Sequence, residues 1–539
     1  MRRGSRPSGN PNTRWYLPLY TPWLLVKGKS PPFMKIRVLP SLLLMVVVST
    51  YARGADILIK NVVVYDGTGT KAFKADVRVR GDRITAIGKN LPAQPGEIVR
   101  DEHGLALAPG FIDMHSHHDH GIFDDLDAEA ATRQGVTTVF VGQDGDSNFP
   151  LADFFGRLEK TPAAINFASM IGHATLRHQV MGNDLYRPST SEELKRMQDL
   201  LARELDAGAF GLSSGLEYEA GHFATTEEMI ELSKVAATHG GFYISHVRDE
   251  ANKVFDSYKE ITRIGRDCKL PVEISHIKLA STGVWHMAKT RMLGVFEMAK
   301  REGVDLKADV YPYTYWESTL RVIVTDRDFF NFEKVRRAIS DNGGATNLLI
   351  TLYRPEPAMA GKTLEQIAAA WKMTPVEAYM RMIKATESEV AGGEEQEEVI
   401  GTSMSEDDVR WFIANPRIMF CSDGELHGAH PRGAGSFPRV LGRYVREQRV
   451  LPLETAIHKM TLMSAEQLSL KDRGRIAQGY IADLVLFDPA TVTDQSTIEH
   501  PQAPPKGIPD VMVSGIWVVA DGKVTGAHPG HVIRHRAAP

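Results

Sequence analysis

Cysteine is scarce in this sequence. The 539 residues contain two, Cys268 and Cys421, which lie far apart and could form one disulfide at most. This excludes the disulfide-rich scaffolds of small secreted proteins. Each cysteine sits near the end of an apolar run, so we expect two buried free thiols.

An excess of basic residues is also missing. Lysine and arginine number 63 against 67 aspartates and glutamates, which gives a net charge of −4, and no basic stripe is interleaved with aromatics. These features exclude the usual signature of a nucleic-acid-binding protein. The composition, 43% hydrophobic and 24% charged residues, is typical of a globular protein, and the length fits a large barrel with an appended domain.

Long hydrophobic runs are absent as well. Leu42–Val48 is an unbroken apolar run that is too short to span a bilayer. The basic stretch Met34–Arg37 precedes it, and small residues follow at Ala52, Gly54 and Ala55. This pattern predicts a signal peptide at about 34–54, with a weak N-terminal anchor as the alternative. We therefore expect a periplasmic or secreted protein with no membrane span after processing.

The two ends of the remaining chain carry short alternating strands. Near the start these are 57–59, 62–64, 77–79 and 84–87, with turns at Asp66-Gly67 and Gly81-Asp82. Near the end they are 484–487, 511–513 and 517–519, with a turn at Asp521-Gly522. Such segments predict strands joined by tight turns. We interpret the two ends as halves of one small β-sandwich.

The middle of the chain alternates buried strands with helices. The clearest predicted helices are 191–207 and 226–238, the first starting behind Ser189-Thr190-Ser191. Eight strands are predicted, at Gly110–Met114, Thr137–Val141, Asn166–Ile171, Phe210–Ser213, Phe242–Ser245, Val272–Ser275, Leu306–Val310 and Ile418–Ser422. This alternation favours an α/β fold with a closed, TIM-like (β/α)₈ barrel.

A long excursion separates the seventh and eighth predicted strands. It covers about 326–408 and has helical periodicity in 364–371 and 375–385, so we expect a subdomain inserted over the barrel mouth. The predicted organisation is an N-terminal extension with signal peptide (1–54), a first β-sandwich part (55–108), the barrel (109–470) and a second β-sandwich part (471–539).

Metal-ligating residue types follow four of the predicted strands. His115 and His117 follow the first, His246 the fifth, His276 the sixth and Asp423 the eighth. In such a barrel the carboxyl ends of the strands form the active site. A His-x-His pair on extended chain places both rings on one face. Imidazole and carboxylate suit zinc, so the pattern predicts a site for one or two divalent ions, with Asp423 as general base.

The same residues carry a resemblance to a known family. Pro109–His117 resembles the first-strand signature of the amidohydrolase superfamily. Three further segments are similar to the D-aminoacylase (N-acyl-D-amino-acid deacylase) branch: Ser422-Asp423-Gly424, His430-Pro431-Arg432 with 437–442, and 482–489. The resemblance runs from about Ala55 to Arg536. It implies a zinc enzyme that hydrolyses the amide of N-acyl-D-amino acids and releases a carboxylate and a D-amino acid.

The resemblance also implies roles for individual residues. The ligand positions match His115, His117, His246, His276 and Asp423. Lys278 and Arg432 match residues that hold the substrate carboxylate. Tyr311 would hold that carboxylate or polarise the scissile carbonyl, and Ser318 would line the same pocket. Arginine and lysine give charge-assisted hydrogen bonds to such an anion.

One departure concerns the second strand, where the family carries an Asn-Cys-Gly sequence whose thiolate binds metal. This chain has Gly142-Gln143-Asp144-Gly145 instead. Asp144 occupies the matching place, and Glu217, after the fourth strand, is the other candidate for the anionic ligand. We prefer Glu217, with a two-metal site, because a glutamate there can bridge two ions.

Two other functions remain open at this point. A dipeptidase for D-residue dipeptides or a cyclic amidase of the dihydroorotase or hydantoinase type would use the same metal site. A non-catalytic secreted binding protein is a more remote alternative. We expect a small-molecule N-acyl amino acid or dipeptide as the partner, and the sequence leaves the oligomeric state open.

Overall fold

The computed structural model describes residues 56–386 and 396–536. The predicted signal peptide lies outside these residues. Within them, no helix combines the length and the apolar character needed to cross a membrane.

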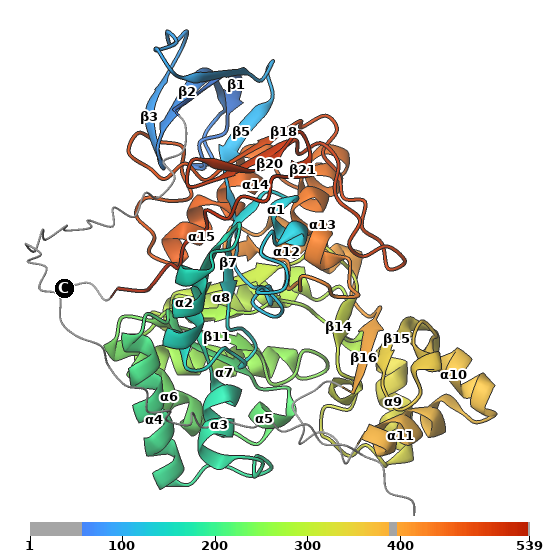
Figure 1. Cartoon of the computed structure of the whole chain (residues 1–539). Helices are drawn as coiled ribbons and strands as arrows, with labels where there is room; N and C mark the ends of the chain where they lie inside the picture. The colour runs from blue at the N-terminus through green and yellow to red at the C-terminus, as the bar shows by residue number, and fades with distance from the viewer. Residues whose placement is uncertain (1–55, 387–395, 537–539) are drawn as a thin grey trace, which may run out of the picture. The chain divides into compact units, whose positions relative to one another are not determined.

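A parallel barrel forms the centre of the described chain (Figure 1). Its strands pair side by side in sequence order, and the third consists of β8 and β9 on either side of Met170. The ring closes between the first and last strands, where the Met114 amide donates to the Phe420 carbonyl and the Asp423 amide to that of His115. The strands are β6 (Phe111–Asp113), β7 (Val136–Val141), β8 (Asn166–Ser169), β9 (Ile171–Gly172), β10 (Gly211–Gly215), β11 (Phe242–His246), β12 (Val272–Ile274), β13 (Leu306–Val310) and β17 (Ile418–Phe420). The eight predicted strand positions and the barrel are therefore confirmed.

Phenylalanine and other large apolar side chains fill the barrel interior. The Phe140 ring packs against those of Phe210 and Phe242, with centroids 5.6 and 5.8 Å apart. Ile112, Met114 and further buried residues complete this cluster. The interior is thus a packed core, as expected for eight strands, and the chemistry is confined to the strand ends.

Helices surround the barrel. α4 begins at a capping box in which Thr190 and Glu193 satisfy each other's backbone amides, as the Ser-Thr-Ser segment indicated. The helices are α1 (Glu129–Thr132), α2 (Leu151–Lys160), α3 (His173–Met181), α4 (Ser191–Asp206), α5 (Glu219–His222), α6 (Thr226–Thr238), α7 (Val254–Cys268), α8 (Leu293–Arg301), α12 (Glu406–Ala414), α13 (Arg432–Arg439), α14 (Leu453–Met460) and α15 (Leu462–Gln467). Both cysteines are buried and free, as predicted.

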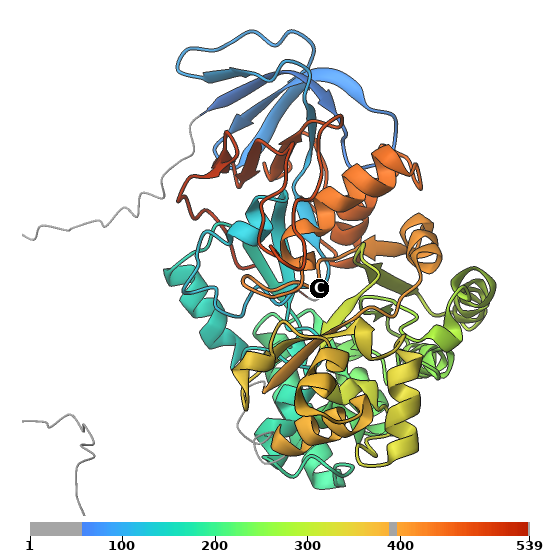
Figure 2. The ribbon, with the colours of Figure 1, turned by 90° about the vertical axis from the view of Figure 1, so that its right-hand side faces the viewer.

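Strands from the two ends of the chain join in one sheet, where the blue and red strands lie together (Figures 1 and 2). The junction is the antiparallel pair β5–β18, in which Leu484 stands opposite Pro109. Apolar residues of both ends share one core, separate from that of the barrel. The strands are β1 (Ile57–Val64), β2 (Phe73–Arg80), β3 (Arg83–Gly88), β4 (Ile98–Asp101), β5 (Ala106–Pro109), β18 (Leu484–Phe487), β19 (Asp510–Val513), β20 (Ile516–Ala520) and β21 (Lys523–Val524).

The excursion between β13 and β17 contains both helices and a sheet. Its helices are α9 (Phe332–Asp341), α10 (Leu364–Trp371) and α11 (Pro375–Thr386). Strands β14 (Trp316–Ser318), β15 (Leu348–Tyr353) and β16 (Glu397–Gly401) form an antiparallel sheet in the order β14-β16-β15, which the periodicity did not predict. β14 begins six residues after β13 ends, so this sheet starts at the barrel mouth.

Candidate metal centre

The predicted ligands converge at the carboxyl ends of the barrel strands. His115 and His117 come from the segment after β6, Asp144 from that after β7, and Asp423 from that after β17. His115 and His117 Nε2 lie 3.4 and 3.5 Å from Asp144 Oδ2, and 3.5 and 3.4 Å from Asp423 Oδ1. Two ligand atoms about 2.1 Å from a tetrahedral zinc ion lie about 3.4 Å apart. These four histidine–aspartate separations therefore match the spacing that such an ion requires, and all four ligand atoms lie within 4.8 Å of one another.

A second set shares Asp144 with the first. His246 closes β11 and His276 follows β12. His276 Nε2 lies 3.3 Å from Asp144 Oδ2 and 3.2 Å from His246 Nδ1, and the latter lies 4.0 Å from the same carboxylate oxygen. These three side chains form another candidate ligand set. Asp144 is common to both.

Unpartnered polar atoms mark the same place. Both ring nitrogens of His115 are buried without a hydrogen-bond partner, and so is Asp144 Oδ1. Buried polar atoms in native proteins normally find a partner. These unpartnered nitrogen and oxygen atoms, together with the histidine–aspartate spacing, show that the residues fit a metal ion.

Electrostatics keep the two aspartates anionic. Burial alone would raise the pKa of Asp144, but His115 and His276 hold it well below its usual range. Burial also opposes ionisation of Asp423, and there Arg432 and His276 lower the pKa well below the ordinary value. Both carboxylates are therefore available as ligands at neutral pH.

Glu217 lies on the other side of His246 from Asp144. Glu217 Oε2 is 2.9 Å from His246 Nε2, whereas His246 Nδ1 faces His276 and Asp144. Glu217, His246 and Glu250 form a third group with metal-ligand spacing. The sequence favoured Glu217 as the anionic ligand. The geometry instead places Asp144 between the four histidines.

The predicted substrate-binding cations both lie at this site. Lys278 Nζ is 5.7 Å from the centre of the Tyr311 ring, and Arg432 Cζ is 5.0 Å from it. Lys278 pairs with Glu250 at 2.8 and 2.9 Å, and Arg432 Nη1 pairs with Asp423 Oδ2 at 2.6 Å. Burial would lower the pKa of Lys278, but Glu250 raises it above its ordinary value, so the ammonium stays charged.

Ser318 lies beside Tyr218. It is part of β14, and its hydroxyl hydrogen-bonds the Tyr218 phenol. The Tyr218 ring is 4.5 Å from that of His246, between centroids. Ser318 therefore reaches the centre through Tyr218.

Three acidic residues at the site were missed by sequence reasoning. Asp113 accepts hydrogen bonds from the amides of Ser422 and His115, at 2.8 and 3.4 Å, so it ties the first strand end to the last. Asp309 accepts from the His276 amide at 2.7 Å. Glu250 holds Lys278. Of these three, only Glu250 could have been identified from the sequence, because it stands four residues after His246, a predicted ligand.

Burial sets the proton affinity of Asp113. The residue is fully buried, and burial raises its pKa to about 7 despite the hydrogen bonds from Ser422. It is a link between backbone segments rather than a ligand, because its partners are Ser422 and His115 amides and the Ser422 hydroxyl.

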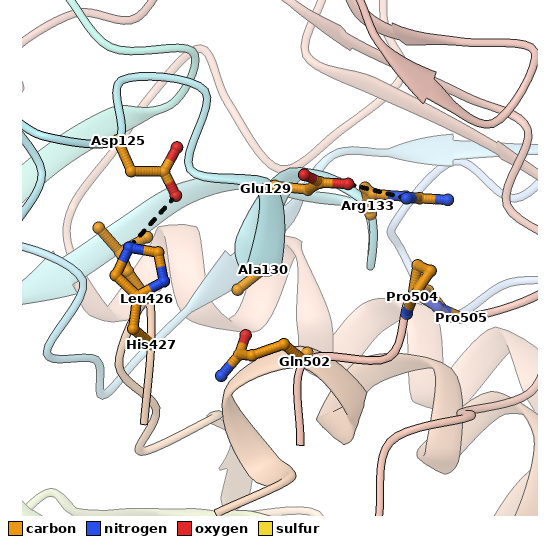
Figure 3. Close-up of a pocket in the computed structure, with 10 residues that line it drawn as sticks. Asp125, Glu129, Ala130, Arg133, Leu426, His427, Gln502, Pro504 and Pro505 are labelled. Carbon is orange, nitrogen blue, oxygen red and sulfur yellow. Dashed lines mark hydrogen bonds and ion pairs between the residues drawn. The ribbon is translucent and has the colours of Figure 1, made fainter. Parts of the chain in front are cut away.

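A separate cavity of about 120 Å³ lies outside this centre (Figure 3). Glu129 and Arg133 pair across one side of it at 2.8 Å, and His427 Nε2 lies 3.9 Å from Asp125 on the other. None of the predicted site residues lines this cavity. It is therefore distinct from the metal centre.

Comparisons with known proteins place the chain in a family. The model of the amidohydrolase family matches residues 99–316 and 356–519. The chain belongs to the amidohydrolase family. It is 37% identical over 508 residues to a D-aminoacylase of Alcaligenes xylosoxydans xylosoxydans, covering 90% of this chain and 98% of that one.

Two further relatives refine this placement. An N-acyl-D-glutamate deacylase of the same organism is 34% identical, over 90% of this chain and 97% of its own length. The solved N-acyl-D-glutamate deacylase of Bordetella bronchiseptica superposes with a TM-score of 0.78 at 32% identity, over 89% of this chain and all of that one. The family resemblance predicted from the motifs is confirmed.

Proposed function

We propose that this enzyme hydrolyses the amide bond of N-acyl-D-amino acids with one or two zinc ions. The observation that carries the proposal is the spacing of His115, His117, Asp144 and Asp423, together with the unpartnered nitrogens of His115. The relatives support the substrate class. They include a D-aminoacylase and an N-acyl-D-glutamate deacylase, and the solved deacylase holds zinc and a phosphonate that mimics the tetrahedral intermediate.

In this reaction the protein's side chains hold the zinc and transfer the proton. His115, His117, His246, His276, Asp144 and Asp423 would hold the zinc. Bound zinc acts as a Lewis acid that lowers the pKa of water and polarises a carbonyl. In this mechanism Asp423 accepts the proton of the attacking water and then donates it to the leaving nitrogen.

The position of Asp423 suits that transfer. Its Oδ1 faces the ring nitrogens of His115 and His117, while Oδ2 faces Arg432 at 2.6 Å. The carboxylate thus spans the ligand side and the cation side of the site. A proton taken at one side can be delivered to a substrate held at the other.

Lys278, Arg432 and Tyr311 form the carboxylate clamp in this proposal. Two cations that both lie close to one aromatic ring can give charge-assisted hydrogen bonds to a planar anion. Burial raises the pKa of the Tyr311 phenol above its ordinary value, so the hydroxyl stays protonated and can donate to the scissile carbonyl. Ser318 and Tyr218 border the same site.

A substrate panel tests the proposal. Metal-depleted and zinc-loaded protein should be assayed on N-acetyl-D-amino acids with apolar, acidic and basic side chains, on their L enantiomers, on D-residue dipeptides and on cyclic imides. We expect zinc-dependent turnover of the N-acetyl-D-amino acids. Turnover restricted to cyclic substrates or to dipeptides would contradict it.

We also propose that the protein is exported. The basic stretch 34–37, the apolar run 42–48 and the small residues at 52–55 support this. N-terminal sequencing of the mature protein from the native host is the test, with a start near Ala55 expected. A mature chain that begins at Met1 or Met34 would contradict it.

A further inference from the structure

Asp144 occupies the junction of the two candidate ligand sets. Its Oδ2 lies within 4.0 Å of a ring nitrogen of all four histidines: His115 at 3.4 Å, His117 at 3.5 Å, His276 at 3.3 Å and His246 at 4.0 Å. Its side chain is 10% exposed, and Oδ1 has no hydrogen-bond partner. An anion placed so centrally is the natural shared ligand of two cations.

The centre contains no sulfur ligand. The chain has two cysteines, and neither belongs to the candidate ligand sets of the described residues. Cys268 donates to the Ile230 carbonyl, and Cys421 is fully buried beside Asp309. The ligand atoms are therefore imidazole nitrogens and carboxylate oxygens alone.

Backbone geometry fixes Asp144 in this place. Its φ is 55°, a left-handed conformation that aspartate adopts more readily than most residues. Gly142 and Gly145 beside it also have positive φ, and the Gly145 amide donates to Ser213 Oγ at 3.2 Å. A Cβ on Gly145 would lie 2.8 Å from the Gly215 nitrogen, so the segment fits tightly against the next strand ends.

Glu217 has a different position. It contacts His246 through Nε2, the nitrogen opposite the one that faces Asp144. A carboxylate that holds the far nitrogen of a ligand histidine fixes the orientation of the ring. The geometry thus makes Glu217 a positioning residue for His246, which leaves Asp144 as the shared anion.

We infer that Asp144 is the ligand common to both metal positions and that it makes this a nitrogen–oxygen centre selective against soft metal ions. The inference rests on the proposed function only in assuming that the site holds metal. Carboxylates favour harder ions, whereas thiolates favour softer ones. The centre should therefore take zinc, cobalt or manganese in preference to cadmium. It should also resist thiol-modifying reagents, because no ligand is a nucleophilic thiolate.

Replacing the carboxylate with a thiolate tests this directly. Wild type, Asp144→Cys and Asp144→Asn are depleted of metal and loaded with cobalt(II) or with competing zinc and cadmium. Asp144→Cys should gain a near-ultraviolet thiolate-to-cobalt charge-transfer band that wild type lacks. Its preference for cadmium over zinc should rise on the order of tenfold or more. Asp144→Asn should lose bound metal relative to wild type.

A matched control distinguishes the effect of a thiol at position 144 from that of a thiol added elsewhere. Asp146→Cys adds a thiol two residues away on a side chain that is 70% exposed, and it should behave as wild type. Circular dichroism checks that each variant folds. If Asp144→Cys does not fold, the metal content of Asp144→Asn tests the inference instead. Wild-type metal binding by Asp144→Asn, or an Asp144→Cys protein without the cobalt band, would overturn the inference.

These readouts are independent of catalysis. Metal content and the cobalt spectrum can match the inference even if no N-acyl-D-amino acid is hydrolysed, in which case only the proposed function fails. Conversely, hydrolysis with unaltered metal binding in Asp144→Asn would reject the inference and leave the proposed function standing.

Discussion

Arg432 offers a test of the carboxylate clamp that can be worked from the structure. It is 8% exposed, its Nη1 lies 2.6 Å from Asp423 Oδ2, and its guanidinium lies over the Tyr311 ring. Arg432→Met keeps the apolar stem and removes the charge. A hydrogen bond between charged groups contributes about 1.5–3 kcal/mol, which corresponds to about a 10- to 150-fold loss of kcat/KM on a substrate that makes this contact.

The assay compares an N-acyl-D-amino acid with its carboxamide. Wild type should prefer the acid, and Arg432→Met should lose about 10- to 150-fold of that preference, because the carboxamide has no charge for Arg432 to hold. Lys278→Met is the matched variant, because Lys278 is the second cation near Tyr311. An equal loss on acid and amide would refute the reasoning, since Arg432 would then act through Asp423 alone.

Three further predictions concern other residues. Asp423→Asn should lower kcat about 10²- to 10⁴-fold with an unchanged circular dichroism spectrum, as expected on losing a general base, and unaltered kcat would contradict that role. Glu228→Gln should destabilise the fold by about 3 kcal/mol in urea unfolding, because it weakens the ion pair of the fully buried Arg177, 2.7 Å away. Burial lowers the pKa of Lys459 from 10.5 to about 7 in the folded protein. Between these two values the unfolded chain keeps a proton on this lysine that the folded protein has lost. The free energy of unfolding of wild type therefore rises with pH in this range, by up to about 1.4 kcal/mol per pH unit. Melting temperatures between about pH 7.5 and 9.5 should show a flatter rise for Lys459→Met, whereas the exposed Lys195→Met should keep the wild-type slope.

The barrel could be predicted from the sequence because its signals are local. Each strand is a short apolar run, and polar residues begin where the run ends, as in Phe242–His246. Fully buried parallel strands have this pattern since both faces are covered. The sheet of the inserted segment was missed for the opposite reason. Trp316 pairs with Gly401 across 85 residues, and no local periodicity records such a pairing.

The candidate site could be predicted only in part. Strand-end positions placed the histidines and Asp423 at one edge of the barrel, and the structure brings them together. The sequence could not decide between Asp144 and Glu217, since both follow strands of the same barrel. That choice depends on which nitrogen of His246 each carboxylate faces, a property of ring orientation rather than of spacing.

The backbone conformation of three ligand residues could not be predicted from the sequence either. Asp144, His276 and Asp423 all have positive φ, at 55°, 31° and 49°. Such conformations cost about 1–3 kcal/mol each and persist where surrounding contacts fix them. Here Asp309 accepts from the His276 amide, and the His115 carbonyl accepts from that of Asp423. These hydrogen bonds join the strained segments to neighbouring barrel strands, so contacts within the fold help to hold His276 and Asp423 in place.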